Sequence, residues 1–435
     1  MLDEKRSAAR PDSPVRPAPR RAGHIASLGL AFCALPLVAF APQSGSGRKK
    51  SQTTAPKQLT PPAPAAPQQL EQPLDPTAID RYDPQIYDVK FEVVMAGFPW
   101  DESQPAMRLE NTPFVLPIIM RGPFSKVAPA SLQPTLFMDT KQDKQITKRA
   151  RLEDNKELGM THALIPLKDY AGSTIRWAVS WKAQVWSCRI DEAVLAKKTW
   201  PREWRADVKE ALKAQRGIES DQPFAKQIAE STLGPNPRSL PPWHAAKEIL
   251  RRVVLGFKSV DTTTYECRSG ERPIGLRFVG AAEAARFERG SVHDLVAVSV
   301  AALRAADIPA RAVVGIIQGL HTSGAGKLTD LPEIISWGEV FVPEAGWIPF
   351  DPNELRGSAV RQLKVGDPWL GVGNIEKLNQ RIPIAWCFAP QGYSSSRYAT
   401  VWGWRPEGST NLTSLEAVIQ VYAVHKGKGI DDPNP

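Results

Sequence analysis

Apolar and polar positions alternate in short strand-like runs through the first folded part of the chain. Residues 85–195 contain β-branched and aromatic runs separated by Gly, Pro and Asp clusters, which predicts an antiparallel β-sandwich. Trp177 and Trp181 lie four residues apart in one run and therefore share a strand face, while Trp186 points to the other. Such residues usually belong to a core. The alternative, a sugar-binding platform made by the three tryptophans, stays open.

From about residue 200 the apolar residues recur at intervals of three and four, which is typical of amphipathic helices. A longer helix is predicted from Val292 to Ala306. It is apolar on most sides, so we expect it to be central and buried. Ser291 and Asp294 stand at the spacing of a capping box, which indicates where this helix begins.

These patterns predict an α+β protein with several successive parts. Strand-like pieces follow the long helix, and a further strand pair lies near the carboxyl end. The expected parts are a basic region with a signal or anchor segment (1–41), a Pro/Gln-rich linker (42–84), a β-rich region (85–195), an α+β core (200–360) and a small β-rich extension (361–435).

An uncharged apolar segment near the amino terminus predicts export. Residues 25–41 carry no charge and follow a basic stretch, which is a secretory-signal pattern. As a helix the segment would span about 25 Å, short of the ~30 Å hydrocarbon core. Pro42 directly after Ala41 disfavours cleavage, so an uncleaved membrane anchor remains an alternative. In either case the preceding basic residues place the bulk of the chain outside the cytoplasm, either anchored or periplasmic.

The net charge of +9 belongs mainly to this leading region. Residues 1–57 hold ten Lys and Arg against three acidic residues, which leaves the remainder nearly neutral. A folded nucleic-acid-binding part would concentrate positive charge instead. The charge distribution therefore predicts no nucleic-acid partner.

Two motifs carry a resemblance to a known family. LRAADIPARAVVG (303–315) and WGEVFVPEAGWIPFDP (337–352) resemble the bacterial transglutaminase-like core, and the similarity extends over roughly 221–353. The resemblance implies a papain-type thiol fold with a Cys-His-Asp triad, preceded by paired helices and often by a β-rich domain.

The positions that the resemblance assigns to the triad carry different residues here. In the family the nucleophilic Cys stands twelve residues before the Arg of Leu-Arg-Ala, and this position is Val292. The family His stands two residues before the Trp of Trp-x-Glu, and this position is Ile335. The acid is retained as Asp351. Because aliphatic side chains neither attack a carbonyl nor move a proton, the triad is predicted to be degenerate.

Other residues could supply a relocated site. Ser291 lies one position from the expected nucleophile, and His293 or His321 could act as its base, although Ser291 is also the expected helix cap. Cys267 precedes the helix by many residues, so we expect a disulfide partner or a small buried residue. No Cys-x-x-Cys or His-x-x-x-His spacing occurs, so the sequence predicts neither a metal site nor a cofactor.

The sequence thus favours a non-catalytic binding or scaffolding protein of the cell envelope. Its expected partner is an envelope protein or a peptidoglycan or other glycan ligand. The alternative is an active cysteine- or serine-type amidase or protease whose catalytic constellation has moved.

Overall fold

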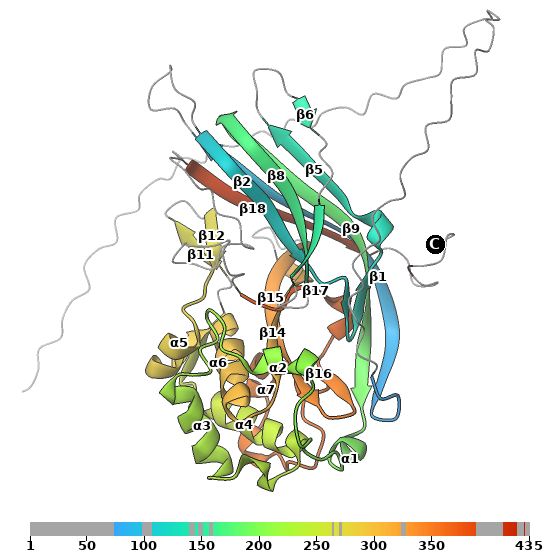
Figure 1. Ribbon diagram of the computed structural model, residues 1–435, viewed down its shortest axis with the longest axis vertical. Coiled ribbons are helices and arrows are strands. Elements are labelled where there is room, and N and C mark those ends of the chain that lie inside the picture. The colour runs from blue at the N-terminus through green and yellow to red at the C-terminus, as the bar shows by residue number, and fades with distance from the viewer. Residues whose placement is uncertain are drawn as a thin grey trace, which may run out of the picture. The chain divides into compact units, whose positions relative to one another are not determined.

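The computed structural model of this chain places the β-rich part and the helical part that the sequence predicts (Figure 1). It describes residues 74–97, 107–138, 144–146, 151–155, 160–262, 265–268, 272–322, 328–388, 412–423 and 430. The predicted signal or anchor segment lies outside these residues, as does most of the predicted linker. Within the described part, no helix has both the length and the apolar character needed to cross a membrane.

Two antiparallel sheets form the β-rich part. The larger sheet is organised around β1 and β9, which pair along most of their lengths, and it contains seven strands. The smaller sheet has three strands in the order β2-β8-β7. The strands of the larger sheet are β1 (Ile79–Gly97), β3 (Arg121–Gly122), β4 (Ser125–Val127), β5 (Gln133–Met138), β6 (Lys144–Ile146), β9 (Thr174–Ile190) and β18 (Leu412–Ala423). Those of the smaller sheet are β2 (Met107–Ile118), β7 (Arg151–Asn155) and β8 (Met160–Gly172).

The two sheets share one hydrophobic core. Phe91 and Val179 of the larger sheet and Leu116 and Met160 of the smaller one are almost fully buried in the same cluster. Trp181 is also buried, with 3% of its surface exposed, and this excludes it from an exposed sugar-binding platform. The side chain of Trp177 lies outside the described residues. Trp186 is half-buried, with cationic side chains near its ring.

Helices begin where proline or a capping side chain favours a first turn. Pro223 and Pro242 occupy the first position of α3 and α4, where the missing N–H costs nothing. Helix α3 ends at Gly234, whose φ of 72° lies in the region that glycine adopts readily. The helices are α1 (Glu192–Leu195), α2 (Ala206–Lys209), α3 (Pro223–Leu233), α4 (Pro242–Gly256), α5 (Ala281–Phe287), α6 (Val292–Ala305) and α7 (Pro352–Arg356). Short 3₁₀ turns are η1 (Pro129–Ser131), η2 (Glu210–Leu212), η3 (Pro237–Ser239), η4 (Val360–Gln362) and η5 (Leu378–Gln380).

Helix α6 packs against a separate four-stranded antiparallel sheet with the order β16-β15-β14-β17. Nearly every residue of α6 is buried, as its apolar pattern predicts. The sheet consists of β14 (Ala310–Thr322), β15 (Leu328–Val342), β16 (Gly346–Phe350) and β17 (Arg381–Ala385). Two small pairs complete the strands: β10 (Ser259–Asp261) with β13 (Arg289–Ser291), and β11 (Tyr265–Arg268) with β12 (Arg272–Leu276).

The α+β class expected from the sequence is confirmed, but the carboxyl-terminal part is built differently from the small appended sheet expected for residues 361–435. Strand β17 joins the four-stranded sheet beside β14, and β18 pairs with β1 at the other end of the chain (Figure 1). The described strands after residue 360 thus complete sheets that earlier segments begin. Strand β1 also starts at Ile79, before residue 85.

Candidate functional site

The start of α6, where the nucleophile is expected, is fixed by a reciprocal cap. Ser291 Oγ accepts a hydrogen bond from the Asp294 backbone N–H at 3.2 Å, and the Ser291 N–H donates to Asp294 Oδ2 at 2.9 Å. Ser291 also donates its own hydroxyl to Asp294 Oδ2 at 2.9 Å. The capping box predicted from the sequence is therefore confirmed. Its hydroxyl is buried and already engaged in both directions.

The second oxygen of Asp294 anchors the chain that leads into α5. Oδ1 accepts the backbone N–H groups of Val279 and Gly280 at 2.9 and 3.0 Å. Burial raises the pKa of this carboxyl, while the hydrogen bonds from Ser291, Val279 and Gly280 oppose that rise. Asp294 consequently joins the first turn of α6 to the loop before α5.

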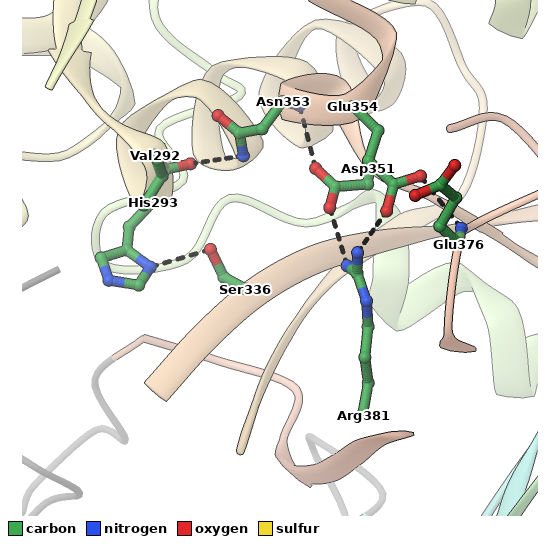
Figure 2. Close-up of polar contacts among 8 residues, drawn as sticks. All are labelled: Val292, His293, Ser336, Asp351, Asn353, Glu354, Glu376 and Arg381. Atoms are coloured by element: carbon green, nitrogen blue, oxygen red, sulfur yellow. Dashed lines mark hydrogen bonds and ion pairs between the residues drawn. The ribbon is translucent and has the colours of Figure 1, made fainter. Parts of the chain in front are cut away.

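The first residue of α6 offers no reactive group. The side chain of Val292 is aliphatic, and its carbonyl oxygen accepts a hydrogen bond from Asn353 Nδ2 at 3.2 Å (Figure 2). Asn353 belongs to α7, so this bond ties the helix start to the segment that follows β16.

The pleat of β15 separates the two residues at the expected position of the base. Ile335 pairs with Gly315 and Ser336 with Val314, and paired residues share a face. Ser336 faces α6, because its Oγ lies 2.8 Å from His293 Nδ1 (Figure 2). Ile335 consequently points to the other face of the sheet. Sequence reasoning missed Ser336, because no local pattern shows which face of β15 meets α6.

His293 and Ser336 form a buried pair between the helix and the sheet. His293 is 0% exposed and Ser336 5% exposed. The ring of Phe388, which follows β17, meets the His293 ring edge-on at a centroid distance of 6.2 Å. The Ser291 hydroxyl is bonded to Asp294 and His293 Nδ1 to Ser336, so these contacts do not join Ser291 to His293. The side chains of His321 and Cys267 lie outside the described residues.

Asp351, the residue predicted to retain the acid of the triad, is bonded to an arginine and to a backbone N–H. Its Oδ1 accepts the Asn353 N–H at 2.9 Å as the cap of α7, and its Oδ2 forms a 2.7 Å ion pair with Arg381 Nη1. Arg381 also binds Glu354 through Nη2 (Figure 2). Glu354 Oε2 accepts the backbone N–H of Glu376 at 3.1 Å. Asp351 therefore caps α7 and links it to β17, while the imidazole of His293 is hydrogen-bonded to Ser336.

The carboxyl of Glu354 titrates near neutral pH. Burial raises its pKa from 4.5 to about 7, and the positive charge of Arg381 opposes that rise. The neighbouring carboxylates of Asp351 and Glu376 add to the rise. Two acidic side chains thus share one arginine.

Comparison with known proteins gives a family for this part of the chain. Residues 229–352 match the model of the transglutaminase-like superfamily. The chain contains a transglutaminase-like domain. The match includes the start of α6 and the Trp-x-Glu segment of β15, so the resemblance seen in the two sequence motifs is confirmed. No curated protein matches the chain.

Solved structures resemble larger parts of the chain at low identity. A proposed cysteine protease from Cytophaga hutchinsonii is 13% identical, with 81% of this chain and 94% of that chain covered and a TM-score of 0.47. The periplasmic domain of TgpA from Pseudomonas aeruginosa is 15% identical, with 63% and 93% covered and a TM-score of 0.27. Red sea bream transglutaminase is 10% identical, with 58% and 49% covered and a TM-score of 0.23.

The motifs of the transglutaminase-like domain form a structural clamp. Arg311 of β14 donates through Nε to Glu339 of β15 at 2.7 Å, and both side chains are largely buried. The guanidinium carbon of Arg311 lies 4.0 Å from the ring centroid of Trp347 and 3.7 Å from that of Trp386. Burial raises the pKa of Glu339, and Arg311 opposes this effect. These contacts hold neighbouring strands together, so the motif residues have a structural role.

Two described cysteines are buried and unsuited to act as a catalytic thiol. Cys188 and Cys387 are free and buried, and burial raises the pKa of each to about 12. A thiol protonated at neutral pH is a poor nucleophile. Among the described residues, no cluster of His, Cys, Asp and Glu could hold a metal ion in the transglutaminase-like domain or elsewhere.

Proposed function

We propose that the chain is a non-catalytic binding or scaffolding protein of the cell envelope, built on a transglutaminase-like domain without thiol chemistry. The observation that carries this proposal is the state of the three triad positions. Val292 has no reactive group, Ile335 lies on the sheet face opposite Ser336, and Asp351 is paired with Arg381. The clamp of Arg311 and Glu339 supports the same proposal, because it preserves the fold without supplying a nucleophile.

The proposed location rests on residues 25–41 and the basic stretch before them. Cell fractionation together with mapping of the mature amino terminus tests it. Recovery of the full chain in a soluble cytoplasmic fraction would overturn the envelope assignment. A mature terminus near residue 42 would indicate a cleaved signal, and an intact terminus in the membrane fraction would indicate an anchor.

An amide-turnover assay tests the absence of catalysis. The purified chain is incubated with a glutamine-containing peptide and a fluorescent primary amine, and both ammonia release and amine incorporation are followed. We expect background rates, equal to those of the Ser291→Ala and Cys267→Ala variants. Turnover that either substitution abolishes would contradict the proposal, because that side chain would then be the nucleophile.

The partner we propose is an envelope protein, or a glycan such as peptidoglycan. Co-sedimentation of the purified chain with isolated peptidoglycan distinguishes the two. Trp186→Ala tests the remaining described aromatic candidate of the β-rich part, and Trp181→Phe serves as a buried control. Binding that is lost only with Trp186→Ala would support glycan recognition there. Absence of co-sedimentation favours an envelope protein.

One specific observation favours a second candidate function, a serine-type amidase. The Ser336 hydroxyl lies 2.8 Å from His293 Nδ1, which is within reach for proton transfer to a general base. Where substrate reaches the pair, this candidate predicts turnover that Ser336→Ala abolishes and Ser291→Ala preserves. The leading proposal predicts no turnover in any of these proteins.

A further inference from the structure

The buried pair of His293 and Ser336 joins the two elements that carry nucleophile and base in the transglutaminase-like family. His293 follows Val292 on α6, and Ser336 follows Ile335 on β15. Each residue stands one position after a degenerate triad position. The roles are exchanged, because the hydroxyl is now on the strand and the imidazole on the helix.

The hydrogen bond has the geometry of a nucleophile and its base. When His293 carries its proton on Nε2, Nδ1 accepts the hydrogen bond that Ser336 Oγ donates across 2.8 Å. A buried serine on the same helix provides a contrast. Ser299 donates its hydroxyl to the Leu295 backbone carbonyl at 2.8 Å, and a carbonyl oxygen is not a base that could remove the hydroxyl proton.

Two phenylalanines from outside α6 and β15 form a layer that begins at the His293 ring of this pair. Phe388 is fully buried and meets the ring of His293, and Phe278 stacks on Phe388 with centroids 4.3 Å apart. Ala385 pairs with Val314, which pairs with Ser336, so the sheet register brings the chain that continues to Phe388 close to the pair.

The phenylalanine pair is held from several sides. The residue after Phe278 is fixed by Asp294, whose Oδ1 accepts the Val279 N–H. A Cβ added at Gly217 would lie 2.4 Å from the Phe278 ring, which shows how closely the ring packs on that glycine. The contact between Phe278 and Phe388 is therefore fixed by the surrounding packing.

We propose that Ser336 and His293 form a nucleophile–base pair for acyl transfer, and that Phe388, supported by Phe278, closes this pair off from solvent. The inference rests on the second candidate function and restricts it: with the pair closed off in the unaltered chain, turnover that depends on Ser336 is expected only after opening. On attack, Ser336 Oγ forms a bond to the acyl carbon, and the hydroxyl proton passes to His293 Nδ1. That proton then reaches the departing amine or alcohol as its bond to carbon breaks, and water later cleaves the ester.

A fluorophosphonate probe tests the proposal directly. In the reaction an O–P bond forms at Ser336, the P–F bond breaks, fluoride leaves and the proton passes to His293. We expect negligible labelling of Ser336 in the unaltered chain, and at least tenfold faster labelling in Phe388→Ala. Peptide mapping identifies the labelled residue, and Ser299 serves as the matched buried serine. In the double variant Phe388→Ala/His293→Gln, the increase in the labelling rate of Ser336 should be lost.

A second variant that should expose the pair keeps the test valid if Phe388→Ala does not fold. Phe278→Ala removes the half-buried ring that supports Phe388, and circular dichroism with thermal unfolding identifies which variants remain folded. Folded variants in which Ser336 stays unlabelled overturn the proposal. Labelling that survives His293→Gln, or that is equally fast in the unaltered chain, also overturns it.

The outcome is separable from that of the leading function. If Ser336 stays unlabelled in the folded variants and amide turnover stays at background, this inference is wrong. The non-catalytic proposal is then still supported. If the unaltered chain turns over substrate and the turnover depends on Ser336, the non-catalytic proposal is wrong. The proposal that Phe388 closes off the pair is then wrong as well.

Discussion

Arg381 Nη1 lies 2.7 Å from Asp351 Oδ2, with the two side chains 9% and 7% exposed. The same guanidinium also binds Glu354. Asp351, which the sequence predicts to be the acid of the triad, is thus the partner of an arginine on β17. The contact stabilises the attachment of α7 to the four-stranded sheet.

Loss of this arginine should be strongly destabilising. Arg381→Met leaves the buried carboxylate of Asp351 without its cation, and removing one member of a buried pair costs about 3–5 kcal/mol. Urea unfolding measures the change in the free energy of unfolding. Arg205→Met is the matched control, because its pair with Asp207 is solvent-exposed, with side chains 63% and 41% exposed. We expect less than about 1 kcal/mol there. Equal losses in the two variants would contradict the structural role of Arg381.

The pKa of Glu354 predicts a pH dependence of stability. Its pKa in the folded protein, about 7, lies above the ordinary value of 4.5, so between these pH values the folded protein binds a proton that the unfolded chain does not. Stability from this group is fully present below pH 4.5 and is lost as pH rises through 7. As pH rises from 5 to 8, the free energy of unfolding should therefore fall less in Glu354→Gln than in the unaltered chain. The expected difference is about 1–3 kcal/mol.

Chemical denaturation at a series of pH values provides the measurement. Glu230→Gln is the control, because Glu230 is 60% exposed in its ion pair with Lys226. Other titrating carboxyls are common to the proteins and cancel in the difference. A Glu354→Gln curve parallel to that of the unaltered chain would show that Glu354 does not titrate in this range.

Removal of the cap at α6 should destabilise the domain without a catalytic effect. Ser291→Ala is expected to cost about 1 kcal/mol. Asp294→Ala should cost more, because its oxygens accept three backbone N–H groups, those of Ser291, Val279 and Gly280. Urea unfolding compares both with Asn236→Ala, an exposed cap of η3. A smaller loss in Asp294→Ala than in Ser291→Ala would refute this ranking.

The start of α6 should still activate a thiol placed there. In Val292→Cys the new side chain lies at the first residue of the helix, where the positive end of the helix dipole lowers a thiol pKa. Leu255→Cys, near the carboxyl end of α4, is the control, because the dipole acts there in the opposite sense. Iodoacetamide should alkylate the first variant faster at pH 7, by about tenfold.

Mass mapping separates the introduced thiol from the native ones. Cys188 and Cys387 should stay unmodified, because their thiols are buried and protonated. We expect no amide turnover from Val292→Cys, since Asp351 and His293 are held by other partners. Slower alkylation of Val292→Cys than of Leu255→Cys would contradict the dipole argument.

Local patterns predicted much of the site, and contacts between distant segments account for what they missed. The capping box of Ser291 and Asp294 depends on residues three apart, so it was visible in the sequence. The bond between His293 and Ser336 depends on which face of β15 meets α6. The ion pair of Asp351 depends on β17 joining the sheet beside β14, a register that no local pattern specifies.

The pairing of β18 with β1 makes the order of synthesis matter for folding. Tyr87 lies opposite Ala423, so this ladder closes a loop of more than three hundred residues. Until β18 has been synthesised and, if the chain is exported, translocated, one edge of β1 lacks its partner and is open to pairing with another chain. A chaperone that shields β1 during this interval would favour folding over aggregation, and chains truncated before residue 412 should aggregate more readily than the full-length protein.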